Sequence, residues 1–193
     1  MYEFIRGDIA DLKPASVVIE AGGIGYLINI SLSTYSKING KKNIRLLIHQ
    51  VVREDAHILY GFADDSERVL FRNLISVNGV GAGTAIMMLS SLSADEIRAA
   101  VASGNAALLT SVKGIGSKTA QRIIIDLRDK IAQYADNSQI LLSPDNTLQK
   151  ESLSALVMLG FAKKDAEKIV SKIIREDPEA SLESVIKQAL KRL

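Results

Sequence analysis

Two segments of this chain repeat each other, and the repeat limits the possible folds more than any other feature of the sequence. LISVNGVGAGTAIMML begins at Leu74, and LTSVKGIGSKTAQRII begins at Leu109. Aligned without gaps, the two segments carry the same residue at Leu74/Leu109, Ser76/Ser111, Val77/Val112, Gly79/Gly114, Gly81/Gly116, Thr84/Thr119 and Ala85/Ala120. A glycine pair reaches backbone conformations that end one helix and allow the next to begin. The pattern predicts a duplicated hairpin of helix, Gly-aliphatic-Gly turn and helix.

The Gly-aliphatic-Gly turns have the chemistry of a phosphate-binding site. The first N–H groups of a helix have no acceptor within the helix, and the helix dipole favours an anion there. Glycines let a phosphate approach the backbone, while the central Val80 or Ile115 anchors each turn in the core. Lys118 and Arg122 lie one helical turn apart, so both can reach one phosphate strand. The candidate DNA-binding residues of the two turns are Gly79, Val80, Gly81, Gly114, Ile115, Gly116, Lys118, Thr119 and Arg122.

Other functions of glycine-rich turns fit the sequence less well. A Walker nucleotide loop needs glycine directly before Lys-Ser/Thr, whereas Ser117 precedes Lys118 here. Gly23 and Gly25 lack the third glycine and the βαβ setting of a dinucleotide-binding fingerprint. A single turn of this kind would favour a helical hairpin without a ligand, because glycine commonly ends helices. Two aligned copies, one of them followed by basic residues, favour phosphate binding instead.

Composition and charge exclude several classes of site. The chain has 193 residues, no cysteine and a formal net charge of +2. Without cysteine there is no disulfide, thiolate metal site or cysteine nucleophile. Residues 66–135 hold eight Lys/Arg against five Asp/Glu, so positive charge is concentrated in the segment that contains the repeat. The acidic N-terminus is unlike a signal peptide and no apolar run is long enough to span a bilayer, so we expect a soluble, cytoplasmic protein with no membrane association.

Residues 1–63 have the features of a small β-barrel. The strand-like runs VVIEAGGIGYLINISL, NIRLLIHQVV and HILYGF are separated by glycine bends and by a charged tip, residues 53–56. An OB-like barrel fits this length and pattern. Tyr60 and Phe62 either stack on bases, as aromatic residues do on many OB faces, or pack in the barrel. Packing is favoured, because apolar residues of these strands must fill a core.

Residues 64–135 have helical periodicity. Leu70, Leu74 and Val77 recur at helical spacing. The run from Ser93 to Glu96 is a capping box, and Gly104 is a suitable end for the helix that it opens. After Gly116, one helical face is predicted to hold Ala120, Ile123, Ile124, Leu127 and Ile131. This region is therefore predicted to be helical throughout, with the repeated turns between its helices.

The C-terminal third is predicted to contain a linker and a small bundle. Residues 136–147 are polar and include Pro144, so they are predicted to form a flexible linker. Residues 148–193 predict three short amphipathic helices: one that ends at Gly160, one from about Lys163 to Glu176, and one capped by Ser181. The predicted core positions of the first helix and the turn after it are Leu153, Leu156, Leu159 and Phe161.

Taken together, these motifs closely resemble the RuvA family, the Holliday-junction-binding subunits of bacterial branch-migration machines. The resemblance rests on VVREDAHILYGF, NGVG, KGIGSKTA and ALVMLGF, which occur in the family's order and extend over nearly the whole chain. It implies an α+β multidomain fold with an OB-like barrel, a tandem helix-hairpin-helix domain and a three-helix, UBA-like bundle. It also implies a non-catalytic subunit without cofactor or metal, acting in homologous recombination, DNA repair and the SOS response.

The resemblance implies partners and further residue roles. Four subunits would form a plate that holds an open four-way junction, either as one tetramer or as two that face each other. The family's acidic pin maps onto Glu54 and Asp55, where repulsion of phosphates would help strands separate, and Arg53 would hold nearby backbone. The C-terminal bundle would bind the RuvB ATPase, and the RuvC resolvase would join a larger complex. The first turn departs from the family pattern, because Ala82-Gly83 stand where a lysine is often found.

Rival interpretations stay open at this point. A structure-selective nuclease would need Glu54 and Asp55 as metal ligands, although adjacent carboxylates without a companion motif make a poor two-metal site. Glu54 and Asp55 could also be an ordinary solvated turn, where carboxylates are common. A plain duplex-binding or protein-interaction module is a further alternative. His49 and His57 have no adjacent nucleophile pattern, so structural roles are favoured for both.

Overall fold

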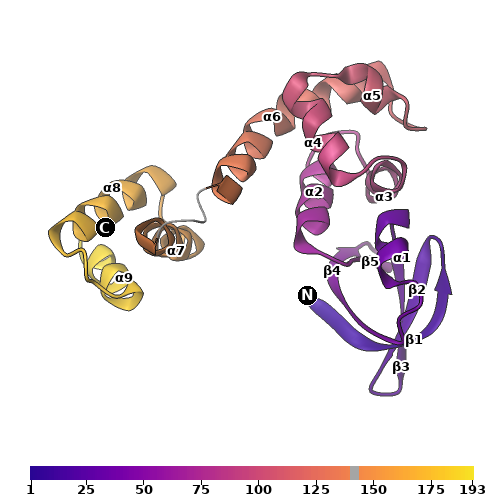
Figure 1. Cartoon of the computed structure of the whole chain (residues 1–193), viewed down its shortest axis with the longest axis horizontal. Coiled ribbons are helices and arrows are strands. Elements are labelled where there is room, and N and C mark those ends of the chain that lie inside the picture. The colour runs from indigo at the N-terminus through magenta and orange to yellow at the C-terminus, as the bar shows by residue number, and fades with distance from the viewer. Residues whose placement is uncertain (140–143) are drawn as a thin grey trace. The chain divides into compact units, whose positions relative to one another are not determined.

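The computed structural model describes residues 1–139 and 144–193 (Figure 1). The chain divides into two compact units, Met1–Ala132 and Gln133–Leu193. The first unit contains a β-barrel and the repeated helical turns, whereas the described residues of the second fold into helices. The α+β multidomain architecture predicted from the sequence is confirmed.

In the first unit, five strands close into a barrel. They are β1 (Phe4–Lys13), β2 (Ser16–Ala21), β3 (Ile24–Ile30), β4 (Asn43–Val52) and β5 (His57–Phe62). The strand order is β1-β2-β3-β5-β4; the β3–β5 pair is parallel, and the other pairs, including the β1–β4 pair that closes the barrel, are antiparallel. The barrel core consists of Ile5, Val17, Ile19, Ile28, Ile30, Ile38, Ile44, Leu46, Ile48 and Leu59. The predicted OB-like barrel is confirmed, and β4 and β5 coincide with the runs NIRLLIHQVV and HILYGF.

Two elements of the barrel region have weak signals in the sequence. Strand β1, FIRGDIADLK, is interrupted by charges, yet it pairs with β2 on one side and with β4 on the other. Gly7 lies where β1 and β2 approach closely, and a Cβ there would collide with the backbone carbonyl of Glu20. Helix α1 (Leu32–Ile38) connects β3 to β4 and is opened by Ser31, whose side chain accepts a hydrogen bond from the Thr34 amide at 3.0 Å. Long-range pairing, more than local pattern, specifies both elements.

The helical half of the first unit follows the predicted pattern closely. It consists of α2 (Asp65–Ile75), α3 (Ala82–Ser91), α4 (Ala94–Ser103), α5 (Ala106–Thr110) and α6 (Ser117–Gln139) as far as Ala132, where the unit ends. The capping box of Ser93 and Glu96 opens α4, and Gly104 ends it with φ of 73°. The predicted inner face of α6 is buried: Ala120, Ile123, Ile124, Leu127 and Ile131. The tandem helix-hairpin-helix prediction is confirmed in its helices and in its turns.

Helix α2 contacts the barrel through two consecutive charged residues near its start. The Glu67 carboxylate, 2% exposed, accepts hydrogen bonds from the hydroxyls of Ser31 and Thr34, the latter at 2.8 Å. The Arg68 guanidinium forms ion pairs with Glu3 at 2.6 Å and with Asp65 at 2.8 Å. Buried charges are tolerated only where partners satisfy them, as they do here.

Aromatic packing completes this contact. Phe71 of α2 is fully buried, and its ring centroid lies 4.9 Å from that of Phe62 and 5.2 Å from that of Tyr60. We define the barrel–helix joint as Glu67, Arg68 and Phe71 together with the barrel residues that they contact. The joint fixes the orientation of α2 on the barrel, because ion pairs, hydrogen bonds and ring packing all have to be satisfied at once.

The second unit contains α7 (Pro144–Met158), α8 (Lys163–Glu176) and α9 (Leu182–Leu190). The three predicted C-terminal helices are present, Gly160 has φ of 98°, and Ser181 caps α9. Leu156 is buried, and Leu153 and Phe161 pack against the core. Leu159 is 60% exposed, so its predicted core position is wrong. It follows the last residue of α7, where the helical period that would have turned it inward has ended.

The linker predicted for residues 136–147 differs from the structure. Helix α6 continues to Gln139, and α7 begins at Pro144, whereas residues 140–143 lie outside the described part of the chain. The polar run ADNSQ contains no glycine or proline to end α6. Proline is well tolerated at the first position of a helix, so Pro144 opens α7 and does not mark a loop.

Candidate nucleic-acid interface

The first candidate turn joins α2 to α3. The Val77 amide donates to the Leu74 carbonyl at 3.1 Å, and the Val80 amide donates to the Val77 carbonyl at 3.0 Å. Gly79 has φ of 92°, a region that other residues rarely adopt. Val77 and Val80 are buried, so the turn is anchored from inside while the glycines stay at the surface.

The second turn, between α5 and α6, has the same geometry. The Val112 amide donates to the Leu109 carbonyl at 3.3 Å, and the Ile115 amide donates to the Val112 carbonyl at 3.1 Å. Gly114 has φ of 93°, within one degree of its counterpart in the first turn. The central Ile115 is 5% exposed, as is the central Val80 of the first turn. The sequence repeat is therefore a repeat of backbone geometry and of burial.

After each turn, the N-terminus of the next helix lies at the surface. The Ala85 amide donates to the Gly81 carbonyl, and the Ala120 amide donates to the Gly116 carbonyl, both at 2.9 Å. The amides that precede these two donors have no acceptor inside their helix. No side chain caps α3 at Gly81 in the described structure. These amide groups are available to an anion, and the positive end of the helix dipole favours one.

The second glycine of each turn is not required by the protein's own packing. Gly81 has φ of −83°, which any residue can adopt. A Cβ built at Gly81 or at Gly116 would meet no atom within 4 Å, in contrast to Gly7 in the barrel. A side chain at either position would cover the amides that open the next helix, so glycine leaves these amides accessible to an anion.

The cationic residues of the second turn lie at the surface. Lys118 and Arg122 are exposed near the start of α6, and Thr119 is half-buried beside them. Among the described residues, neither Lys118 nor Arg122 has a recorded ion pair or hydrogen bond. Both side chains are therefore available to a phosphate strand.

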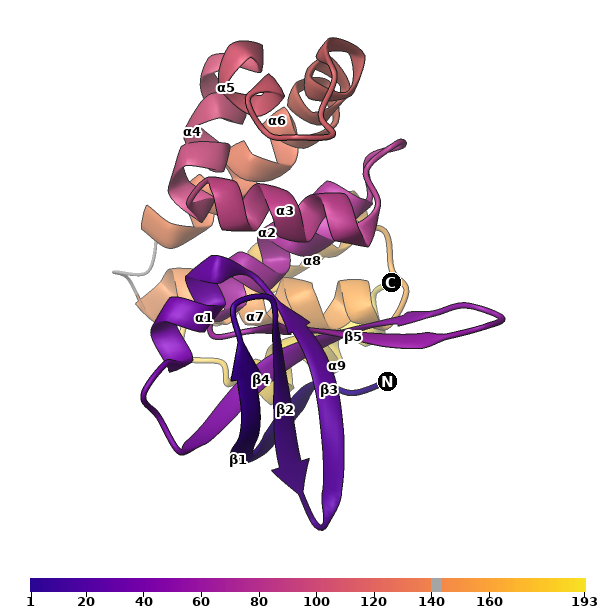
Figure 2. The same ribbon diagram turned by 90° about the vertical axis from the view of Figure 1, so that its right-hand side faces the viewer.

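The candidate acidic pin lies on a different element. Arg53, Glu54 and Asp55 are exposed at the tip of the β4–β5 hairpin, which extends well beyond the barrel in Figure 2. The Arg53 amide donates to the Ala56 carbonyl at 2.8 Å and closes the tip. The pin and the two turns come from separate parts of the first unit, so a ligand that touches all of them has to be large.

Comparison with known proteins identifies the family. The model of the RuvA N terminal domain matches residues 1–61, that of the SAM-like helix-hairpin-helix tandem matches residues 71–129, and that of the RuvA C-terminal domain matches residues 147–193. A Bacteroides thetaiotaomicron protein named Holliday junction branch migration complex subunit RuvA is 50% identical over 201 residues, and the match covers 100% of both chains. The chain belongs to the RuvA family. Proteins with the same name from Christiangramia forsetii and Flavobacterium psychrophilum are 50% and 47% identical over 193 residues, again over 100% of both chains.

The matched regions of this RuvA family member agree with its structural elements. The N-terminal match ends at residue 61, within β5. The helix-hairpin-helix match spans residues 71–129 and contains both turns, the region for which tandem hairpins were predicted. The C-terminal match begins at residue 147, within α7. The resemblance read from the motifs is confirmed over the full length of the chain.

Tyr60, Phe62 and His49 of the barrel have structural roles in this family member. Tyr60 is 8% exposed and Phe62 is fully buried, so neither is available to stack on bases. His49 packs edge-to-face on Phe71 with ring centroids 5.3 Å apart. Partial burial lowers the pKa of His49, and the nearby Arg72 and Arg68 lower it further, so the ring is neutral at physiological pH. These rings are packed, as predicted, but they pack in the barrel–helix joint and not only inside the barrel.

Two absences in the described part of the chain bear on other functions. Over residues 1–139 and 144–193, no group of three or more His, Asp or Glu residues is placed to hold a metal ion. In the same part of the chain, no helix combines the length and apolar character needed to cross a membrane.

Two features of the first unit have weak signals in the sequence. Lys113, in the second turn, escaped notice because the repeat draws attention to matching residues, and Lys113 stands opposite the non-matching Asn78. Glu67 and Arg68 of the joint look like ordinary charges near the start of a surface helix, where acidic residues are common. Only the fold shows that both side chains are buried.

Proposed function

We propose that this chain is the Holliday-junction-binding subunit of a branch migration complex, and that it binds junction DNA through its two Gly-aliphatic-Gly turns. One observation carries the proposal: Gly81 and Gly116 are glycines that neither backbone strain nor internal packing requires. In a family whose members are named for this complex, a phosphate backbone is the ligand that explains them.

The expected contacts are Gly79, Val80, Gly81, Gly114, Ile115, Gly116, Lys118, Thr119 and Arg122. These residues would bind phosphates through backbone amides and cationic side chains, so binding does not depend on base sequence. Recognition of a junction then depends on its shape, that is, on how its arms present phosphates to several subunits at once. The subunit does no covalent chemistry; it holds the junction open and positions the motor.

The pin residues Glu54 and Asp55 would face the centre of the junction. Two unit charges about 4 Å apart repel by about 1 kcal/mol in water and by more near a protein surface. Carboxylates from several subunits would keep phosphates away from the crossover and favour separation of base pairs there. Arg53 would balance this repulsion by holding the backbone of the strands as they turn.

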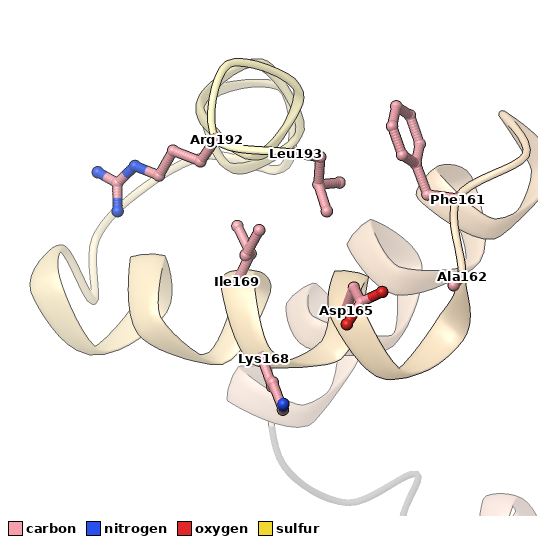
Figure 3. A pocket seen from close by; sticks show the side chains of 7 residues that line it. All are labelled: Phe161, Ala162, Asp165, Lys168, Ile169, Arg192 and Leu193. Atoms are coloured by element: carbon pink, nitrogen blue, oxygen red, sulfur yellow. The ribbon is translucent and has the colours of Figure 1, made fainter.

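The second unit offers a surface for the motor protein. We propose that it binds the RuvB ATPase through exposed apolar residues at the end of α7, where Met158 is 86% exposed and Leu159 is 60% exposed. A pocket of about 400 Å³ has Val157 and Met158 in its lining. A second pocket of the bundle, of about 370 Å³, is lined by Ile169 and Leu193 among others (Figure 3). Exposed apolar side chains beside a pocket are typical of a protein-binding surface.

Assembly and cellular setting complete the proposal. Four copies would surround one junction as a homotetramer, either alone or as two tetramers that sandwich the DNA. The RuvC resolvase would join a larger complex on the same junction. The site of action is the cytoplasm, where the bacterial chromosome lies, in recombination, repair and the SOS response.

The decisive experiment is competition binding combined with light scattering. Purified protein should keep a labelled four-way junction in the presence of a large excess of linear duplex with the same arm sequence. The complex should contain four or eight copies of the chain per junction. Equal competition by duplex would leave only a plain duplex-binding module, and cut strands in the presence of magnesium would support the nuclease alternative.

The pin has its own test. Glu54→Lys combined with Asp55→Lys should preserve or tighten junction binding, because repulsive charges become attractive ones, yet branch migration with the motor should slow. Glu20→Lys, at an exposed position of β2, is a control that adds positive charge to the barrel away from the pin. Normal branch migration by the pin variant would remove the pin from the mechanism.

A further inference from the structure

The two turns share one backbone geometry but differ in charge. With the fixed offset of the repeat, Lys113, Lys118 and Arg122 of the second turn correspond to Asn78, Gly83 and Met87 of the first. From Asn73 to Ala94 the sequence contains no charged residue. The first turn therefore has no cation in its own segment, and the cation recorded beside it is Lys130 of α6, whose ammonium donates to the Ser76 hydroxyl at 3.1 Å. The second turn has cationic side chains of its own.

We infer that Lys113 is a further phosphate-binding residue, and that the salt-dependent part of the grip on DNA lies in the second turn while the first binds through its amides. This inference rests on the proposed function and assigns different physical roles to its two turns. Neutralisation of phosphates by Lys or Arg releases counterions and makes binding salt-dependent, but a contact from a neutral amide does not.

The position of Lys113 is set by the turn itself. Val112 before it is 2% exposed, and Gly114 after it has φ of 93°. The hydrogen bond from the Ile115 amide to the Val112 carbonyl, 3.1 Å long, spans Lys113 and fixes its backbone. The side chain is exposed and leaves from the same surface turn as the glycines. An ammonium group there can reach a phosphate that the amides of Gly116 and its neighbours hold.

Three other cations of this helical region have partners within the protein. Arg68 pairs with Glu3 and Asp65, Arg98 pairs with Asp95 at 2.9 Å, and the Lys130 ammonium donates to the Ser76 hydroxyl at 3.1 Å. For Lys113, no ion pair or hydrogen bond is recorded within residues 1–139 and 144–193. An exposed lysine without an internal partner, beside an anion-binding backbone, is placed to serve a ligand.

The repeat supplies a matched pair of variants. Lys113→Asn places in the second turn the residue that the first turn already has, and Asn78→Lys does the reverse. Each new residue occupies a backbone geometry in which the natural protein already holds it, so both variants should fold. Lys164→Asn, which removes an exposed lysine of α8, controls for the loss of one positive charge.

The measurement is junction affinity as a function of salt concentration. Each phosphate contact contributes roughly 0.9 to the slope of log K against log salt. Lys113→Asn should flatten the slope by roughly 0.9 for each engaged subunit. When salt rises from 50 to 200 mM, the affinity of the variant for the junction should therefore fall by a factor roughly 3.5-fold smaller, per lost contact, than that of the natural protein. Asn78→Lys should steepen the slope by a similar amount, and Lys164→Asn should leave it unchanged.

The outcomes separate this inference from the proposed function. If the natural protein prefers junctions but Lys113→Asn matches Lys164→Asn in slope and affinity, Lys113 is a solvated surface lysine and the inference is overturned. If the natural protein has no preference for junctions over linear duplex, the proposed function itself fails. Melting curves of all variants check that each is folded.

Discussion

The barrel–helix joint and the Gly-aliphatic-Gly turns differ in whether their polar groups have hydrogen-bond partners within the protein. In the joint, both oxygens of the Glu67 carboxylate accept hydrogen bonds from buried hydroxyls. In the turns, the amides that open α3 and α6 lie at exposed glycines, and no described side chain caps α3. A polar group that is buried without a partner is costly, whereas water satisfies one at the surface until a ligand replaces it.

The difference separates stability from binding within one unit of the chain. Hydrogen bonds that close inside the joint hold the barrel and its acidic hairpin at a fixed angle to the helices. Hydrogen-bonding groups left open at the turns contribute little to folding and are free to bind. Substitutions in the joint should therefore change stability first, and substitutions at the turns should change DNA affinity first.

The largest effect is expected in the joint. Glu67→Ala leaves the buried hydroxyls of Ser31 and Thr34 without their acceptor and should lower the free energy of unfolding by about 3 kcal/mol. Glu67→Gln keeps one acceptor oxygen and should cost about 1 kcal/mol. Urea unfolding measures both, with Glu151→Ala, an exposed position on α7, as the control. A loss no greater than that of the control would show that the joint is not held by this carboxylate.

An intermediate effect is expected at the turns, in affinity and not in stability. Gly81→Val and Gly116→Val place a side chain where nothing inside the protein opposes it, so the free energy of unfolding should change by no more than about 1 kcal/mol. Junction affinity should fall at least about tenfold, equivalent to about 1.4 kcal/mol, because the amides become inaccessible to phosphate.

Gly25→Val on β3 is the matched control for the turn variants, since its Cβ would make ordinary contact with Val18 at 3.4 Å. Gel-shift titration of a four-way junction compares the three proteins. If Gly81→Val or Gly116→Val bound the junction as tightly as Gly25→Val, the turns would not be the binding site that the comparison with the joint assumes.

The smallest expected effect is a pH dependence of the free energy of unfolding, caused by an ion pair at the edge of the joint. The Lys37 ammonium lies 2.5 Å from the carboxylate of Asp64, the residue that caps α2. Partial burial raises the pKa of Asp64, but hydrogen bonds from Lys37, Ser66 and the Glu67 amide outweigh it and leave the pKa below its ordinary value. The lowered pKa means that the ionised carboxylate stabilises the fold above about pH 4, and that this contribution is lost as pH falls through the folded pKa.

The pKa of Lys37 is raised, chiefly by its hydrogen bond to Asp64, so its contribution is lost only as pH rises above its ordinary value of 10.5. Both side chains are partly exposed, so the pair should contribute only about 0.2–1 kcal/mol. The free energies of unfolding of Asp64→Asn and of the natural protein should differ at pH 7 and converge as the pH falls below the folded pKa of Asp64. A constant difference across that range would assign the effect to helix capping alone.

Much of the helical half could be predicted because its signals are local. The capping box at Ser93, the stop at Gly104 and the buried face of α6 each depend on residues within a few positions of one another. The turns were found by the repeat, and their anchors Val80 and Ile115 are buried as expected. The core position of Leu159 and the bounds of the linker differ from the structure, both at helix ends, where a periodic pattern does not say where it stops.

The sequence by itself determined the order of barrel, repeated hairpins and C-terminal helices, and the chemistry of the two turns, because periodicity, caps and glycine pairs act over short stretches of chain. Only the tertiary structure decided that β1 closes the barrel, that Glu67 is buried and that Arg68 reaches back to the N-terminal segment. Those contacts join residues 36 and 65 positions apart, from Ser31 to Glu67 and from Glu3 to Arg68. No local pattern encodes such contacts, since they exist only after the barrel and the helices have packed together.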